Sequence, residues 1–446
     1  MIFTIDKQTI SDLELKEKSK DEKSIFSLFN YTKTNGGKNK LELFFNNPLT
    51  DITLLENRIK ILKYLFNSNA KYRFDKKDFD FIEFYLSQQN APDRFSVSQS
   101  IFIAVSNLFR PRNDYYIIQR GISYLIKVLN EFYSLITDIK SDDSPHYILN
   151  CRDRITEILE NGPLKIIVLL KNRTTLNPLE LGKLDYYFRK SFRNEVREIL
   201  DIIYEFDAFL SVVECHKKQG FSFPEYSRDA KFYQVEGLFH PFLHDPVSNN
   251  FEFTPQKNIC FLTGPNMAGK STFLKSLSIS IYLSHIGFPV PAKRLTTSIF
   301  NGLLTTINLP DNITKGYSHF YNEVLRVKYV AEKINQAGNL FVVFDEIFRG
   351  TNVKDAYEAS LAVLSSFSKL NNSLFAVSTH IIEVGEQLRK YDSVFFKFFD
   401  ANFVDGTPHY TFSLHDGITD ERIGMYILSK EKVIEIIESR NNDTES

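Results

Sequence analysis

The sequence has few cysteines, almost no net charge and no long apolar run, and each absence excludes a class of protein. Cys151, Cys215 and Cys260 are far apart and form no CxxC pair, so the sequence indicates neither a disulfide framework nor a zinc site. The 54 Lys and Arg against 55 Asp and Glu exclude nucleic-acid coating by bulk charge, although a local basic patch is still compatible.

No apolar run is long enough to cross a bilayer, and the opening MIFTIDKQTI carries charges where a signal peptide has its apolar core. The scarcity of cysteine also fits a reducing compartment. We therefore expect a cytoplasmic protein that does not contact a membrane. The chain is long for one hydrophobic core, at 446 residues, and its composition is globular, so two or more domains are expected.

The first half of the chain reads mostly as helix. Between residues 118 and 136, apolar residues recur at intervals of three and four, which predicts an amphipathic helix. They are Ile118, Ile122, Leu125, Leu129, Phe132 and Ile136. A second such run extends from Leu184 to about Lys218 and would measure about 50 Å if continuous. Two antiparallel bundle helices and a protruding lever are both compatible with these runs.

The pattern changes at GFSFPEYSRD, residues 220–229, which marks a domain junction. Beyond it, three short apolar runs alternate with helical stretches: NICFLT, LFVVF and LFAVST. Such runs are typical of a parallel sheet covered on both faces. Near the end of the chain, SVFFKFF and HYTFSL predict added antiparallel strands.

These observations predict an all-α core or lever domain followed by a mostly parallel α/β domain with antiparallel additions. We place the first domain at residues 1–228 and the second at 229–430. Residues 431–446 are expected to be the end of a helix and a frayed tail.

A phosphate-binding loop is predicted at TGPNMAGKST, residues 263–272. Gly264, Gly269, Lys270 and Ser271 fit GxxxxGK[ST], directly after a predicted strand and before a predicted helix. The glycines let backbone N–H groups point at phosphates at the positive end of that helix. Lys270 is expected to contact the β and γ phosphates, and the Ser271 hydroxyl a Mg²⁺ ion. A chance match is the alternative.

Two carboxylates follow the predicted strand within FVVFDEIFRGT, residues 341–351. Asp345 would lie at the carboxyl edge of the sheet, where it can hold Mg²⁺ through water. Glu346 can orient and polarise an attacking water, which indicates hydrolysis rather than transfer to a second substrate. The alternative is an acidic pair that only stabilises a helix start.

Two further segments carry polar groups suited to a nucleotide. LFAVST ends in Thr379 and is followed by His380, whose imidazole could sense the γ-phosphate or assist the water, or be merely structural. KGYSHFYNEVLRVK places Ser318 at the start of a helix, where N–H groups and a hydroxyl attract anions. Because the chain already has its own phosphate loop, the natural target of Ser318 is the nucleotide of another subunit.

Together, GPNMAGKST, DEIFRGT, STH and the S-x-F-x-x-E pattern of Ser318, Phe320 and Glu323 resemble the ATPase domain of the MutS family, a branch of the ABC ATPases. HIGFPVPAK and EGLFHPFL continue the resemblance. In the first half, residues 29–65, with their PLTD turn, and residues 195–226 resemble the helical core of the same family. The resemblance covers most of the chain, in two blocks with a divergent middle.

The resemblance implies a role for each matching residue. Lys270, Glu346 and His380 would be catalytic, Ser271 and Asp345 would hold Mg²⁺, and Ser318 would act in trans on the ATP of a partner subunit. The segment from Pro246 to Asn250 would contact adenine. The residues expected to bind ATP are Gly264, Pro265, Asn266, Met267, Ala268, Gly269, Lys270, Ser271, Thr272 and Ser318.

The sequence also departs from the family pattern. Ala268 and Phe348 stand where the family has glycine, and no mismatch-reading module, connector, full DNA clamp, helix-turn-helix dimerisation module or nuclease domain is evident. We therefore expect a reduced MutS-like, Mg²⁺-dependent ATPase. It would work as a homodimer that opens and closes around DNA, in mismatch repair or a related repair or recombination process, with a separate repair or recognition protein as a further partner. The alternative is an ATP-driven switch that acts on a protein or RNA partner without recognising mismatches.

Overall fold

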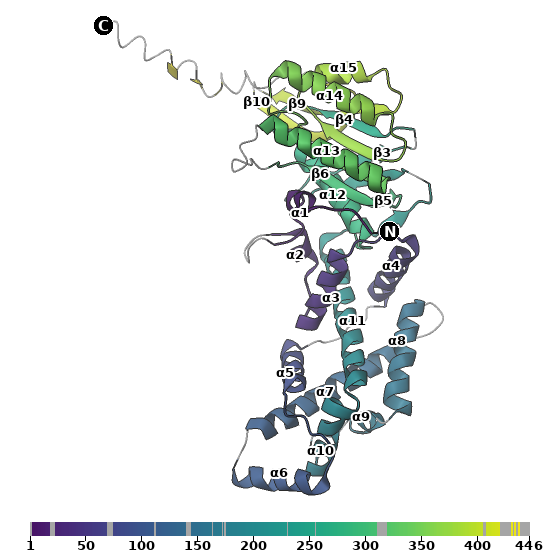
Figure 1. Ribbon diagram of the computed structural model, residues 1–446, viewed down its shortest axis with the longest axis vertical. Helices are drawn as coiled ribbons and strands as arrows, with labels where there is room; N and C mark the ends of the chain where they lie inside the picture. The colour runs from purple at the N-terminus through teal and green to yellow at the C-terminus, as the bar shows by residue number, and fades with distance from the viewer. Residues whose placement is uncertain are drawn as a thin grey trace, which may run out of the picture. The chain divides into compact units, whose positions relative to one another are not determined.

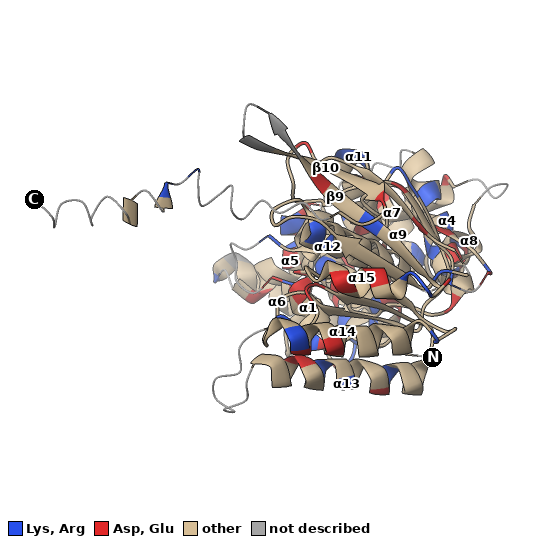
Figure 2. Cartoon of the chain, turned by 90° about the horizontal axis from the view of Figure 1, so that it is seen from above, with Lys and Arg blue, Asp and Glu red and all other residues tan. Residues whose placement is uncertain are grey.

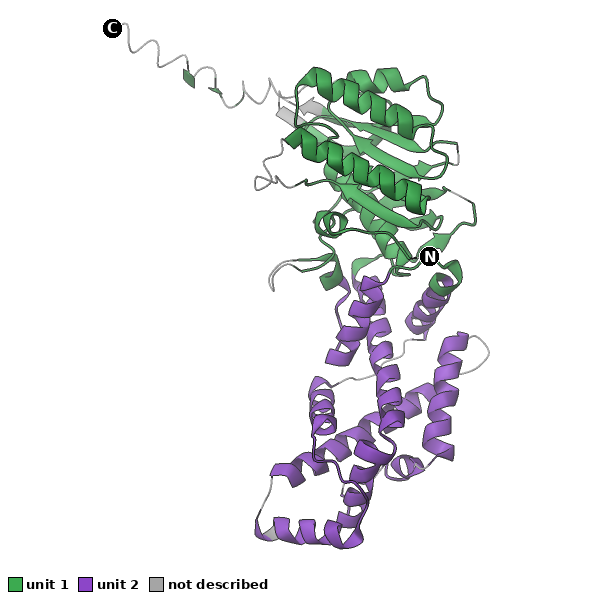
Figure 3. Ribbon diagram, viewed as in Figure 1, with its two compact units in different colours: residues 1–27, 48–55, 219–446 green, residues 28–47, 56–218 purple. Residues whose placement is uncertain are grey.

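The chain folds into two compact units in a computed structural model (Figure 3). Unit 1 comprises residues 1–27, 48–55 and 219–446, and unit 2 comprises residues 28–47 and 56–218. The structure describes residues 2–17, 23–68, 75–110, 113–139, 144–162, 164–171, 173, 175–229, 231–254, 256–309, 319–404, 407–419, 430, 432–433 and 436–437. Most of the predicted C-terminal helix end and tail, 431–446, lies outside these residues.

Unit 2 is helical, as the sequence predicts. Its helices are α3 (Asn35–Asn46), α5 (Lys76–Ser87), α6 (Val97–Phe109), α7 (Asn113–Thr137), α8 (His146–Thr156), α9 (Lys165–Leu169), α10 (Pro178–Tyr186) and α11 (Arg193–Gln219), while α2 (Ile25–Phe29) and α4 (Ile52–Asn67) pass from one unit to the other. The apolar stripe predicted for residues 118–136 lies on α7, where Leu125, Leu129 and Phe132 are fully buried. This stripe is buried because it is the apolar face of an amphipathic helix.

The run from Leu184 to Lys218 is not one continuous α-helix. α10 passes into a π-helical turn, η2 (Tyr187–Ser191), and α11 begins at Arg193. At this turn Arg189 forms a buried ion pair with Asp185, which also accepts a hydrogen bond from the Tyr85 hydroxyl at 2.8 Å. The periodicity could not reveal the break, because a single π turn shifts the apolar stripe by only one residue.

Unit 1 contains a six-stranded sheet in the order β10-β9-β4-β8-β7-β6. Its strands are β4 (Ile259–Thr263), β6 (Gly302–Thr306), β7 (Leu340–Phe344), β8 (Leu374–Ser378), β9 (Val394–Val404) and β10 (Thr407–Asp416). The strands predicted at NICFLT, LFVVF and LFAVST are thus confirmed. The prediction that β9 is antiparallel is wrong, because β9 pairs in parallel with β4 and only β10 is antiparallel. The chain reaches β9 through helix α15 (Ile382–Leu388), and such a crossover returns it in the same direction.

A second sheet of four strands, in the order β1-β5-β2-β3, packs beside the first. It is formed by β1 (Glu225–Tyr226), β2 (Tyr233–Leu238), β3 (Asn249–Phe253) and β5 (Arg294–Thr297). Rings join the two sheets directly, since the centroid of Phe253 lies 5.7 Å from that of Phe341 and 5.3 Å from that of Phe395. The fold of this unit is therefore an α/β arrangement with a mostly parallel central sheet (Figure 1).

Helices cover both faces of the six-stranded sheet. On one face, α13 (His319–Ala337), α14 (Val353–Phe367) and α15 pack through side chains such as Val330, Leu364 and Val384. On the other face, α12 (Lys270–His285) is buried along nearly its whole length, and the Tyr233 hydroxyl of β2 is 2.7 Å from the Ser280 hydroxyl. Burial on both sides explains why every position of the central strands is buried and why all but the last residues of β4 and β8 are apolar.

His285, the last residue of α12, is a structural histidine. The backbone N–H of Phe300 donates to its Nε2 at 2.9 Å, so Nδ1 carries the proton and donates to the Ile281 carbonyl at 2.8 Å. Burial lowers the pKa of His285 to about 4, so the ring is neutral at physiological pH. It fixes the end of α12 against the chain that leads into β6.

Residues 1–27 belong to unit 1. The sequence instead predicts them as part of the helical domain, at residues 1–228. Helix α1 (Lys7–Asp12) and the residues before it lie along β6, the edge strand of the six-stranded sheet. Thr4 forms a parallel bridge with Gly302: its N–H donates to the Asn301 carbonyl at 2.8 Å, and its carbonyl accepts from Leu303 at 2.9 Å. Nothing in the local sequence distinguishes this pairing, because the partners are about 300 residues apart.

Basic and acidic residues are interspersed along the outer helices α13 and α14, as the colours of the cartoon in Figure 2 show. This mixture agrees with the formal net charge of −1. Among the helices of the described part of the chain, none combines the length and the apolar composition that spanning a bilayer requires.

Candidate nucleotide-binding site

A cavity of about 580 Å³ opens at the carboxyl edge of β4 in unit 1. One side of it is polar and comes from the predicted phosphate loop and the acidic segment: Asn266, Met267, Gly269, Lys270, Ser271, Thr272 and Glu346. The other side is formed by residues of β2, β3, β9 and β10 and by the segment that joins β2 to β3. Its volume lies in the range of pockets that hold a small-molecule ligand.

The loop from Gly264 to Gly269 has the backbone conformation that its glycines allow. Gly264 has a φ of +138°, and a Cβ there would lie 2.6 Å from the carbonyl oxygen of Phe399. Gly269 has a φ of +104° and is the N-cap residue of α12. Larger residues at either position would force the loop to move, so the turn that leads from β4 into α12 depends on both glycines.

Lys270 is buried, with only 5% of its surface exposed, and its Nζ points back along the loop. It donates to the carbonyl oxygens of Gly264 at 2.8 Å and Pro265 at 3.0 Å. Burial lowers the pKa of Lys270, while Glu346 and Asp345 act in the opposite direction. The ammonium group is therefore the positive charge on the floor of a cavity that also contains the N-terminus of α12.

Asp345 follows β7 and is fixed by neighbouring strands. Its backbone N–H donates to the Thr306 carbonyl of β6 at 2.9 Å, and its carboxylate accepts from the Ser378 hydroxyl at the end of β8. The same hydroxyl accepts from the N–H of Glu346 at 2.9 Å. Ser378 was not among the residues predicted from the sequence, although it directly precedes Thr379 at a predicted strand tip.

Glu346 and His380 meet at the tips of β7 and β8. The Nε2 of His380 lies 2.7 Å from Oε1 of Glu346, and Arg349 approaches the other carboxylate oxygen at 3.5 Å. The hydrogen bond with His380 lowers the pKa of Glu346 to about 2, against the effect of burial. Glu346 has a φ of +56°, an uncommon conformation for a residue with a side chain and one that concentrates at functional sites.

The segment after Glu346 is tied to the first turns of α13. Glu323 is buried and accepts from the N–H groups of Arg349 at 3.3 Å and Gly350 at 3.2 Å. The ring of Phe320 lies 5.6 Å from that of Phe348. Phe348 has a φ of +59°, which explains why glycine would suit this position, and burial of its ring against α13 offsets the strain.

Four phenylalanines that were not predicted from the sequence line the apolar side of the cavity, namely Phe239, Phe273, Phe399 and Phe412, and Phe412 is the most exposed of them. Phe412 of β10 lines the cavity, is 43% exposed and has a φ of +54°. Its strand bulges there, since the pairing of β10 with β9 shifts register between Tyr410 and Leu414. Asn249 fills the bulge: it donates to the Phe412 carbonyl at 3.0 Å and accepts from the Leu414 N–H at 2.8 Å.

The structure thus brings together the phosphate loop, Asp345, Glu346 and His380 at one edge of the sheet. Pro246, Val247 and Asn249, from the segment expected to contact adenine, line the same cavity. Ser318 lies outside the described residues. Within the described part of the chain, no cluster of three or more His, Cys, Asp or Glu residues could hold a metal ion.

Comparison with known proteins identifies the domain that carries this site. Residues 260–445 match the family model of MutS domain V. The match begins in β4, just before the phosphate loop, and includes every strand of the six-stranded sheet.

Whole-sequence relatives extend the similarity beyond this domain. The chain is 25% identical over 334 residues to DNA mismatch repair protein MSH3 of Vanderwaltozyma polyspora, which covers 72% of this chain and 32% of the relative. It is 28% identical to DNA mismatch repair protein MutS of Petrotoga mobilis, over 52% of this chain and 29% of the relative. The corresponding protein of Lactococcus lactis is 25% identical over 53% of this chain and 29% of its own.

Each of these matches covers less than one third of the relative's own length. The similarity to MSH3 nevertheless spans more of this chain than the ATPase domain alone, and the helical unit precedes that domain as the sequence predicts. The C-terminal part of the chain, residues 260–445, is therefore an ABC-type ATPase domain of the MutS domain V kind, and the chain is similar to MutS-family proteins beyond this domain.

Proposed function

We propose that the chain binds and hydrolyses ATP in the cavity at the carboxyl edge of β4. The observation that carries this proposal is the convergence of a buried lysine, a helix N-terminus and the Glu346 carboxylate on one cavity of about 580 Å³. The loop from Gly264 to Thr272 would hold the phosphates through its N–H groups and Lys270.

Glu346 would orient the attacking water and accept its proton, because its carboxylate faces the cavity and is ionised at neutral pH. His380 would hold Glu346 in position through their hydrogen bond of 2.7 Å and contact the γ-phosphate. Asp345 and Ser271 offer the oxygen ligands that Mg²⁺ prefers, and a bound Mg²⁺ would neutralise phosphate charge.

Phe412 and the apolar wall beside it would hold the adenine base. The ring is partly exposed to the cavity and held in place by the bulge that Asn249 fills. Stacking of a base on an aromatic ring contributes about 1–3 kcal/mol, so Phe412→Ala is expected to weaken binding of a fluorescent ATP analogue about tenfold. Fluorescence titration checks this, with Phe398→Ala on β9 as the control, because the Phe398 ring lies 5.4 Å from that of His415 and does not line the cavity. An unchanged dissociation constant for Phe412→Ala would remove Phe412 from the base site.

We further propose that the active form is a homodimer in which Ser318 contacts the partner's ATP, and that ATP binding closes the dimer around DNA. Closure of this kind is a population shift driven by contacts that exist only in the closed state. The relatives named above are DNA mismatch repair proteins, and the chain shares with them the ATPase domain. This similarity supports the proposal of a role in mismatch repair or a related repair or recombination process.

The decisive experiment measures the ATPase rate with duplex, mismatched, branched and single-stranded DNA at two salt concentrations. We expect stimulation by one DNA form at low salt and its loss at high salt, because phosphate contacts release counterions. A rate that no DNA changes would contradict the DNA-linked function. It would favour a switch that acts on a protein or RNA partner.

A further inference from the structure

The outer edge of β6 is satisfied by the first residues of the chain rather than by another strand. Three alternate N–H groups point outward from the end of this edge and each has a partner in that segment. Leu303 donates to the Thr4 carbonyl at 2.9 Å, and Thr305 to the Thr9 hydroxyl at 2.9 Å. Ile307 donates to Oδ2 of Asp12 at 2.9 Å.

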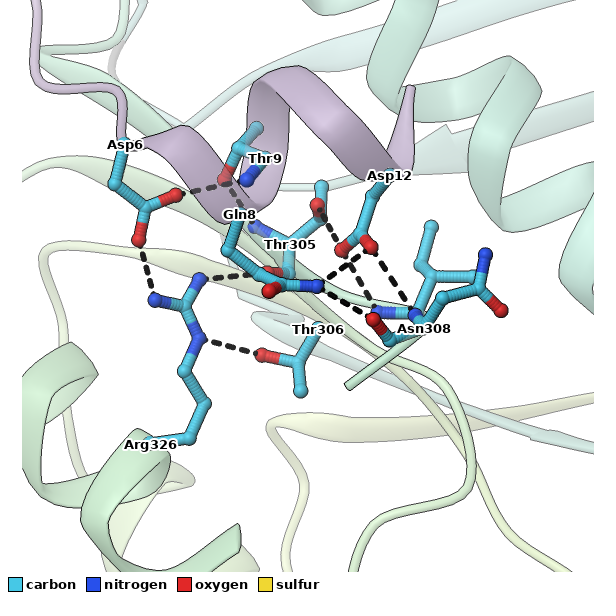
Figure 4. Close-up of polar contacts among 9 residues, drawn as sticks. Asp6, Gln8, Thr9, Asp12, Thr305, Thr306, Asn308 and Arg326 are labelled. Atoms are coloured by element: carbon cyan, nitrogen blue, oxygen red, sulfur yellow. Dashed lines mark hydrogen bonds and ion pairs between the residues drawn. The ribbon is translucent and has the colours of Figure 1, made fainter. Parts of the chain in front are cut away.

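Asp12 is the centre of these contacts (Figure 4). Its carboxylate is 2% exposed and also accepts from the Thr305 hydroxyl at 2.8 Å, from the Asn308 N–H at 3.1 Å and from the Gln8 amide at 2.8 Å. All its acceptor positions face donors, so the end of β6 has one fixed position relative to α1.

Arg326 closes the arrangement from α13. Its guanidinium donates to the Asp6 carboxylate, to the Thr305 carbonyl at 2.6 Å and to the Thr306 hydroxyl at 3.0 Å. Burial would raise the pKa of Asp6, but Arg326 outweighs it and the pKa is lowered, so the pair is ionised. A planar group with three directed hydrogen bonds fixes orientation in a way that a lysine cannot.

This arrangement adjoins the nucleotide site. The carbonyl of Thr306 accepts a hydrogen bond from the N–H of Asp345 at 2.9 Å. Thr306 therefore contacts both Arg326, through its hydroxyl, and the backbone of Asp345. Arg326, Asp345 and Glu346 line one small cavity of about 20 Å³. A shift of the β6 end would therefore move Asp345 directly.

Buried ion pairs are a weak source of stability compared with apolar packing. Their advantage is directional placement, which a catalytic edge requires to within about half an ångström. The contacts of the Thr9 hydroxyl, the Asp12 carboxylate and the Arg326 guanidinium fix the position of the end of β6, where Thr306 contacts Asp345.

We propose that Asp6, Asp12 and Arg326 are positioning residues of the ATPase site: they hold the end of β6, which in turn places Asp345 for its role beside the nucleotide. This inference rests on the proposed function. The N-terminal segment is thus part of the catalytic architecture, although none of its described residues, 2–17, lines the nucleotide cavity.

The test compares Arg326→Ala and Asp12→Ala in the full chain with two controls. Lys328→Ala removes an exposed positive charge from the same helix, and Asn258→Ala removes buried hydrogen bonds at the opposite end of β4. For Arg326→Ala and Asp12→Ala we expect kcat to fall about tenfold while the affinity for a fluorescent ATP analogue changes less than twofold. Amide exchange at Asp345 should accelerate about tenfold. Arg326→Lys keeps the positive charge beside Asp6 but not the three directed hydrogen bonds, so it should restore only part of kcat.

The control variants should keep the wild-type kcat and the wild-type exchange of Asp345, even if Asn258→Ala lowers the melting temperature. If Arg326→Ala and Asp12→Ala lose only stability and keep both kcat and slow exchange at Asp345, the inference is overturned. A wild-type chain without ATPase activity would contradict the proposed function instead, and the exchange rate at Asp345 would still decide whether the segment positions this residue.

Discussion

Glu346→Gln is expected to lower kcat for ATP about a thousandfold and to leave ATP affinity within twofold of wild type. Glutamine has nearly the same shape, so it preserves the packing at the tips of β7 and β8, but it cannot accept a proton from water. If hydrolysis resets a closed dimer, the variant should also lengthen the dimer's lifetime. Single-turnover hydrolysis and analytical ultracentrifugation with ATP check both expectations.

The matched control is Glu383→Gln, which removes an exposed carboxylate in the first turn of α15, close to His380 in sequence. It should hydrolyse ATP like wild type. Because the pKa of Glu346 is about 2, protonation of Glu346 should not reduce the rate between pH 7 and pH 5. Hydrolysis by Glu346→Gln at the wild-type rate would exclude Glu346 as the group that activates water.

Lys270→Ala is expected to weaken ATP binding about a hundredfold, since hydrogen bonds to a charged group contribute roughly 1.5–3 kcal/mol each. Nζ is the positive charge on the floor of the cavity, and alanine leaves the phosphates only the N–H groups of the loop. The fold should persist, because the burial of Lys270 already lowers its pKa and disfavours its charged form. Isothermal titration with a non-hydrolysable ATP analogue measures the loss.

Lys275→Ala provides the comparison for this variant. Lys275 is on the same helix, α12, pairs with Glu14 at 3.1 Å and is not among the residues that line the cavity. Its replacement should change ATP affinity less than threefold. Equal losses in the two variants would mean that net positive charge near α12, and not the placement of Lys270, determines binding.

The elements that the sequence predicts correctly are those encoded by neighbouring residues. β4, β7 and β8 are uninterrupted apolar runs, and the loop between β4 and α12 has its glycines and lysine at fixed spacing. Asp345, Glu346 and His380 were placed together because carboxyl ends of parallel strands meet at one edge of a sheet. The structure places Glu346 and His380 in direct contact there.

The features that escaped prediction depend on distant partners. Phe412 lies in a bulge of β10 that is held by hydrogen bonds with Asn249, more than 160 residues away in the chain. The π turn before α11 forms where the Arg189–Asp185 pair is buried against Tyr85. The pairing of Thr4 with β6 joins residues about 300 positions apart, and no local pattern of apolar residues signals such a contact.

The pairing at the edge of β6 also bears on solubility. An edge strand with free N–H and C=O groups is a template on which a second chain can add, and proteins avoid this by covering or interrupting the edge. Here the backbone of Thr4 pairs with the start of β6. The side chains of Thr9 and Asp12 accept hydrogen bonds from the N–H groups of Thr305 and Ile307, and side chains present no further row of backbone groups to another strand. The first residues of the chain therefore end the sheet, and this protects the protein from intermolecular strand addition and aggregation through β6.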